Sequence, residues 1–93
     1  MTRARARHIL VASKELCEEL KTKIAAGEDF ADLAEQHSTC PSGREGGNLG
    51  EFGPGQLVKE FDEVVFSAPL HEVQGPVKTQ FGYHLLEVTE RQD

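Results

Sequence analysis

The chain has 93 residues, of which 38% are hydrophobic and 28% charged, a composition typical of one small globular domain spanning residues 1–93. No apolar run reaches the length of a membrane span, and a formal charge of −6 argues against nucleic acid or an anionic membrane as the main partner. Two cysteines are too few for a disulfide framework, and no apolar leader precedes the first predicted strand, so we expect a cytoplasmic protein.

The first third of the chain predicts a strand followed by two helices. Residues 5–11 end in Ile-Leu-Val without a breaker, which favours a strand that places His8 and the arginines on opposite faces. An apolar side chain at every fourth position predicts a helix over residues 14–26. Asp29 is then expected to cap a second helix that ends near Ser38.

The middle of the chain changes character. Residues 39–56 hold six of the nine glycines and two of the four prolines, which predicts a long loop with a short strand at residues 49–52. Long loops in compact domains are often functional. The segment lacks the glycine and lysine spacing of phosphate-binding loops, so we interpret its glycines as turn residues.

The last third predicts one helix and two strands. Helical spacing returns over residues 58–67, and a short strand is expected at residues 75–77. The best strand pattern covers residues 79–89, where Phe81 would share a face with Tyr83. Because some links are too short for crossovers between parallel strands, we predict an α+β fold with an antiparallel sheet, in which the last two strands form a hairpin.

Three arginines alternate along the first predicted strand. Arg3, Arg5 and Arg7 therefore share one face of it. We interpret them as a solvated basic edge, because charged side chains protect strand edges from unwanted pairing. The alternative is a surface that binds an acidic partner.

Histidines and cysteines supply the candidate chemistry. If the terminal strands pair, His8 and His84 meet within the sheet, either as hydrogen-bonded structural residues or as part of a site. Cys40, which opens the glycine-rich loop, is an incidental thiol, a nucleophile beside a histidine or the polarisable wall of a cleft. Cys17 lies on the apolar stripe of a helix, which indicates core packing. No short paired spacing indicates zinc, so we predict no metal site.

Three large apolar side chains leave two interpretations open. Leu57, Phe61 and Phe81 can belong to the core, as large apolar residues usually do, or they can line a shallow pocket beside the loop. Ligand pockets typically combine apolar walls with a few convergent polar groups.

Five short segments follow one another in a characteristic order. They are His-Ile-Leu-Val at 8–11, Ser-Thr-Cys-Pro-Ser-Gly at 38–43, Gly-Gly-Asn-Leu-Gly-Glu-Phe at 46–52, Gly-Gln-Leu-Val-Lys-Glu-Phe-Asp at 55–62 and Gly-Pro-Val-Lys-Thr-Gln-Phe-Gly-Tyr-His at 75–84. In this order and spacing they resemble the parvulin family of peptidyl-prolyl cis/trans isomerases, over roughly residues 5–90. The chain is similar to a small stand-alone bacterial parvulin.

The resemblance implies a fold and a site. The fold would be a four-stranded antiparallel sheet surrounded by helices, with two histidines on neighbouring central strands. The catalytic residues that it implies are His8, Cys40 and His84. The substrate-binding residues that it implies are Leu57, Phe61 and Phe81 in a proline pocket, Thr79 in the histidine network and Gln80 near the pocket rim.

The chain departs from the family pattern at three places. Leu57 stands where the family often has Met, which keeps an apolar wall, and Asn48 stands where it often has Asp. Phosphate-directed parvulins carry a basic loop after the first strand, whereas residues 11–15 here offer one lysine beside a glutamate. We therefore expect an apolar or neutral residue before the proline rather than a phosphoserine.

The implied function is isomerisation of X-Pro bonds in peptides and in unfolded or partly folded chains, by a monomer. Rotation makes and breaks no bond, so we expect a noncovalent route with no cofactor, and Cys40 as a polar neighbour of the reacting amide. One alternative is a noncatalytic, chaperone-like module that holds extended proline-containing segments. Another is a thiol hydrolase that uses Cys40 and a histidine.

Overall fold

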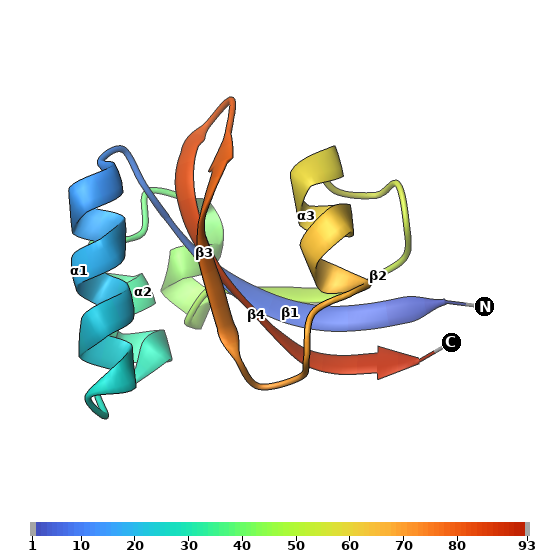
Figure 1. Cartoon of the computed structure of the whole chain (residues 1–93), viewed down its shortest axis with the longest axis horizontal. Helices are drawn as coiled ribbons and strands as arrows, with labels where there is room; N and C mark the ends of the chain where they lie inside the picture. The colour runs from blue at the N-terminus through green and yellow to red at the C-terminus, as the bar shows by residue number, and fades with distance from the viewer. Residues whose placement is uncertain (1, 93) are drawn as a thin grey trace.

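A four-stranded antiparallel sheet organises the computed structural model, which describes residues 2–92 (Figure 1). The elements in chain order are β1 (Arg3–Val11), α1 (Lys14–Ala25), α2 (Phe30–His37), a 3-10 helix η1 (Pro41–Glu45), β2 (Asn48–Phe52), α3 (Lys59–Val65), β3 (Val73–Thr79) and β4 (Gly82–Gln92). The strand order β2-β1-β4-β3 confirms the predicted α+β fold and makes β1 and β4 the central pair. Within residues 2–92, no helix combines the length and apolarity needed to span a membrane.

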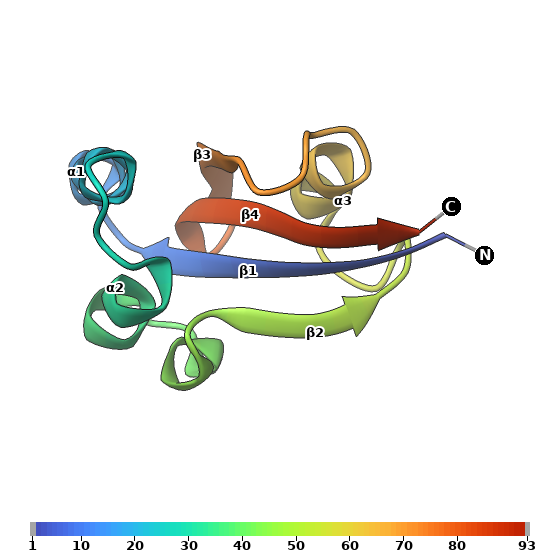
Figure 2. The same ribbon diagram turned by 90° about the horizontal axis from the view of Figure 1, so that it is seen from below.

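Alternation along β1 and β4 divides the apolar side chains between two cores, one on each face of the sheet. On one face, Ile9 and Leu85 are buried against α1 and α2, together with the thiol of Cys17, as predicted. On the other face, Leu86 is buried against α3 and its residue Phe61. Figures 1 and 2 show α3 at the opposite end of the molecule from α1 and α2.

Local signals place the starts of the first two helices correctly. The side chain of Ser13 accepts a hydrogen bond from the Leu16 N–H and caps α1. The Asp29 carboxylate accepts one from the Asp32 N–H and caps α2. The glycine-rich segment contains the predicted short strand as β2, but also the helix η1, which the sequence did not indicate.

The interpretation of the first three arginines as a protected strand edge is wrong. β1 is a central strand that is bonded to β2 on one side and to β4 on the other, so it has no free edge. The arginines instead lie across one face of the sheet and pair with glutamates of the neighbouring strands. These pairs are Arg3 with Glu51, Arg5 with Glu51 and Glu90, and Arg7 with Glu87.

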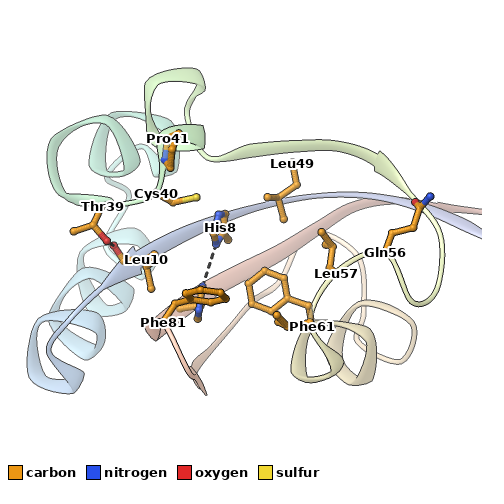
Figure 3. Close-up of a pocket in the computed structure, with 12 residues that line it drawn as sticks. His8, Leu10, Thr39, Cys40, Pro41, Leu49, Gln56, Leu57, Phe61 and Phe81 are labelled. Atoms are coloured by element: carbon orange, nitrogen blue, oxygen red, sulfur yellow. Dashed lines mark hydrogen bonds between the residues drawn. The ribbon is translucent and has the colours of Figure 1, made fainter.

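The turn between β3 and β4 corrects the last predicted strand, which began three residues too early. Thr79 ends β3 and pairs with Gly82, the first residue of β4, so Gln80 and Phe81 form a tight turn between them. This reversal moves Phe81 away from the face that it was predicted to share with Tyr83. Phe81 instead projects to the side of the sheet that carries the two histidines (Figure 3).

Two glycines let neighbouring backbone approach the histidine positions closely. Gly47 has φ +87°, and a Cβ atom there would lie 2.3 Å from the carbonyl oxygen of His8. Gly75 has φ +136°, and a Cβ atom there would lie 2.6 Å from the carbonyl oxygen of His84. Only glycine fits at either position. The backbone of β1 at His8 is therefore packed against the backbone at Gly47, and the backbone of β4 at His84 is packed against the backbone at Gly75.

Candidate active site

A chain of hydrogen bonds joins four side chains through the centre of the sheet. The Nδ1 atoms of His8 and His84 lie 3.1 Å apart, as expected for residues on neighbouring central strands. The Nε2 atom of His8 lies 3.0 Å from the hydroxyl of Ser42, and the Nε2 atom of His84 lies 2.7 Å from the hydroxyl of Thr79. The Thr79 oxygen also accepts the Phe81 N–H, which anchors the turn to the chain of bonds.

The central bond restricts how the two rings carry their protons. A neutral imidazole has one N–H donor and one bare nitrogen that accepts. For two Nδ1 atoms to bond, one ring must carry its proton on Nδ1 and the other on Nε2, so His8 and His84 must be opposite tautomers. All four ring nitrogens then have a partner, and the hydroxyls at the two ends adapt to either direction of the chain.

Burial keeps both imidazoles neutral. The side chains of His8 and His84 are almost fully buried, at 3% and 2% exposed. Loss of hydration, together with the smaller effect of the charge that His84 would carry, lowers the pKa of His8 to about 4. Burial also lowers the pKa of His84, although the Glu60 carboxylate opposes this change. The Phe61 ring stands edge-on to both imidazoles, with ring centroids 5.4 Å from His8 and 4.7 Å from His84.

An apolar hollow of about 580 Å³ opens beside this pair of imidazoles (Figure 3). Its size is within the range of small-ligand sites. It contains no lysine, arginine, aspartate or glutamate among its lining residues. These are His8, Leu10, Thr39, Cys40, Pro41, Leu49, Gln56, Leu57, Val58, Phe61, Phe81 and His84.

The three large apolar residues that the sequence assigned either to the core or to a pocket all line the hollow. They are Leu57, Phe61 and Phe81. Phe61 does so while also belonging to a core, since it is only 4% exposed. Phe81 is 61% exposed, and the only other large apolar side chain that is clearly exposed within residues 2–92 is Leu70, at 41%. A phenyl ring held in a turn over an apolar hollow, with most of its surface in water, is placed for a ligand rather than for core packing.

Cys40 lies on the opposite side of the hollow from Phe61 and Phe81, with its sulfur toward His8 in Figure 3. The imidazole nitrogens already bond to each other, to Ser42 and to Thr79. No ring nitrogen is therefore left to take a proton from the thiol, which argues against the predicted alternative of a Cys–His nucleophile.

The other implied residues take different places. Thr79 belongs to the hydrogen-bonded chain but does not line the hollow, and Gln80 is exposed in the turn beside Phe81 without lining it. Ser42 was missed, because a serine in a glycine-rich loop gives no signal until η1 carries it to His8. Its place within the Ser-Thr-Cys-Pro-Ser-Gly segment was the one available clue. Within residues 2–92, no group of three His, Cys, Asp or Glu side chains could hold a metal ion.

Comparison with protein families and curated proteins gives consistent matches. The family model described as Rotamase, PPIC-type PPIASE domain, matches residues 5–90. The foldase protein PrsA of a Geobacillus species is 49% identical over 90 residues, covering 96% of this chain and 33% of that protein. The foldase protein PrsA of Bacillus subtilis is 47% identical over 87 residues, with 92% and 30% covered. The chain thus spans about a third of the length of the curated relatives it matches.

Solved structures agree with this result. The crystal structure of the peptidylprolyl isomerase PrsA from Bacillus anthracis matches with a TM-score of 0.95 and 32% identity, over 99% of this chain and 43% of that one. The solution structure of NmPin, the parvulin of Nitrosopumilus maritimus, matches with a TM-score of 0.87 and 33% identity, over 97% and 98% of the two chains.

The low pKa of His8 predicts a specific loss of stability in acid. Between about pH 4 and pH 6.5 the unfolded chain binds a proton at His8 that the folded chain does not, so the free energy of unfolding falls as the pH is lowered through this window. Urea denaturation at pH 6.5 and 4.5 should show a loss smaller by roughly 2 kcal/mol in His8→Asn than in the unsubstituted chain. His71→Asn, which replaces an exposed histidine outside the hydrogen-bonded chain, is the matched control and should keep the full loss. Equal losses in all three proteins would contradict a buried neutral His8.

Proposed function

The chain belongs to the parvulin family of PPIC-type peptidyl-prolyl cis/trans isomerases, and from this premise we propose that it accelerates rotation about X-Pro peptide bonds. One observation carries the proposal. An uncharged, apolar hollow is closed by two neutral imidazoles whose nitrogens are all bonded within the protein. Such imidazoles have no free nitrogen to act as the base of a hydrolytic reaction. The site instead suits a reaction that changes only a torsion angle.

The reaction sets a clear requirement. Resonance across the peptide C–N bond creates a rotational barrier of about 18–20 kcal/mol, and uncatalysed X-Pro isomerisation takes tens to hundreds of seconds. A catalyst must bind the twisted amide better than either planar form. Each 1.36 kcal/mol of this preference raises the rate about tenfold.

The apolar walls would hold one side of the rotating bond still. Leu57, Phe61 and Phe81 offer aliphatic and aromatic surface that matches a prolyl ring. With the ring gripped, the carbonyl on its N-terminal side turns relative to it. Planar amides are more polar than twisted ones, so a surface without charged groups removes some of the hydration that favours the planar forms.

The imidazole pair would give the hollow its shape and its electrostatic character. Because His8 and His84 direct their hydrogen bonds to each other and to two hydroxyls, they present ring faces and edges to the substrate without a charge. Cys40 adds a polarisable, weakly donating thiol near the turning carbonyl. The route is noncovalent, since the imidazole nitrogens that could activate that thiol are already bonded within the protein.

The surroundings support neutral substrates at the bond itself. No lysine or arginine lines the apolar hollow. In the segment after β1, the hydroxyl of Ser13 caps α1 and is therefore not offered to a substrate. We therefore propose an apolar or neutral residue before the proline, and clients that are proline-containing peptides or partly folded chains. The word foldase in the names of the relatives supports such clients. The cytoplasmic location and the monomeric state stay predictions.

Removal of the exposed phenyl ring tests the grip on proline. Phe81→Ala should lower kcat/KM for a prolyl tetrapeptide at least tenfold, because the ring contacts substrate, yet change the free energy of unfolding by less than about 1 kcal/mol, because the ring is mostly in water. Leu70→Ala, which truncates the other exposed large apolar residue, is the matched control and should keep full activity.

Exchange spectroscopy, which needs no protease, separates catalysis from mere holding. A module that only binds would shift the peptide's peaks without adding cis–trans exchange cross-peaks. That outcome, or full activity in folded Phe81→Ala, would contradict the proposed function of the hollow.

A second substitution tests the role of the thiol. Cys40→Ser keeps a small polar group and should retain at least about a tenth of the activity, because the proposed route forms no bond to sulfur. Complete loss of isomerisation in a protein that folds normally would indicate covalent participation. Cys17→Ser is not a suitable comparison, since Cys17 is fully buried in a core.

A further inference from the structure

A second hollow lies behind the segment that carries Cys40. Its volume is about 530 Å³, and it shares Thr39, Cys40 and Pro41 with the apolar hollow. On its other side, the end of α2 contributes Glu35 and η1 contributes Arg44. The two hollows are therefore neighbours, separated by a ridge only three residues long.

Hydrogen bonds to β1 hold this ridge in place. The backbone N–H and the hydroxyl of Thr39 both donate to the carbonyl oxygen of Leu10, over 2.8 and 3.3 Å. The Leu10 N–H in turn donates to the hydroxyl oxygen of Ser38, over 3.1 Å. Leu10 also lines the apolar hollow, so the ridge has a fixed position relative to both hollows. These bonds use polar groups that the second hollow would otherwise offer to a ligand.

The two hollows differ in charge. The apolar hollow has no charged lining residue, whereas the second hollow has the exposed carboxylate of Glu35 and the exposed guanidinium of Arg44. The arginines of β1 pair with glutamates, and Arg91 donates to two carbonyl oxygens at the end of α3. In the part of the chain that the structure describes, Arg44 makes no such contact, so its donors remain available. A guanidinium binds a carboxylate through two parallel hydrogen bonds.

We propose that the second hollow binds substrate residues on one flank of the proline, and that Arg44 there favours an acidic side chain. This inference rests on the proposed isomerase function of the apolar hollow. An extended chain advances about 3.3 Å per residue, so a peptide with its prolyl ring in the apolar hollow reaches across the ridge within a few residues. The residue next to the proline stays in the uncharged region, and the acidic preference applies further along the peptide.

The negative charge of the whole chain makes a local cation necessary for this preference. A net charge of −6 disfavours acidic peptides at long range, so a preference for them requires a local cation. Glu35 limits the preference to one acidic group, because its carboxylate would repel a second carboxylate of the peptide. An exposed ion pair of this kind corresponds to a two- to fivefold gain.

A peptide panel measured by exchange spectroscopy tests the inference. Peptides with a central Ala-Pro carry aspartate, asparagine or lysine at one position, two or three residues before or after the proline. We expect aspartate to raise kcat/KM two- to fivefold over asparagine on one flank only, and 0.5 M salt to remove most of this gain. Arg44→Gln should abolish the gain, and Arg44→Glu should transfer it to lysine. Lys59→Gln, which removes an exposed cation that lines neither hollow, is the matched control and should leave the gain unchanged.

The outcomes separate this inference from the proposed function. Isomerisation of all peptides with equal efficiency, or a preference that survives Arg44→Gln, would overturn the second hollow as an acidic subsite. If no peptide is isomerised, the proposed function fails, and titration of the same peptides followed by chemical shifts decides the subsite alone. Tighter binding of the aspartate peptide through Arg44 would then sustain it, and equal binding would overturn it.

Discussion

The hydrogen bond between the Nδ1 atoms of His8 and His84 is the interaction on which the rest of the site depends. It forms because β1 and β4 are antiparallel neighbours in a register that brings the two rings to the same face. The outer nitrogens of the pair then reach Ser42 on η1 and Thr79 at the end of β3. Three hydrogen bonds centred on this pair thus link four separate elements of the chain around the floor of the hollow.

This arrangement explains how so charged a chain holds an uncharged site. Strand alternation directs the arginines of β1 and their glutamate partners to one face of the sheet, and His8 to the other. On the second face, the imidazole nitrogens are all hydrogen-bonded within the protein, so they add neither charge nor unsatisfied donors to the hollow. The acceleration that we propose depends on that neutrality, because rotation of an amide is favoured where water and charge do not stabilise its planar forms.

Much of the fold could be predicted from the sequence, because its signals are local. Two-residue alternation divided the terminal strands between two faces, and capping residues placed the first two helices. Five segments resembling a known family gave the apolar walls, which no spacing rule would have separated from core residues. Alternation could not distinguish an edge strand from the solvated face of a central one, so the role given to Arg3, Arg5 and Arg7 was wrong. Ser42 acquires its role only through the fold of η1, and the place of Phe81 follows from the start of a turn one residue before it.

The most direct test of the account is a measurement of the protons on the two imidazoles. Nitrogen-15 chemical shifts of the ring nitrogens distinguish an N–H, a bare nitrogen and a charged ring. At pH 7 the account predicts that His8 and His84 are both neutral, one with its proton on Nδ1 and the other with its proton on Nε2. Two rings with protons on the same type of nitrogen, or either ring charged at that pH, would contradict it.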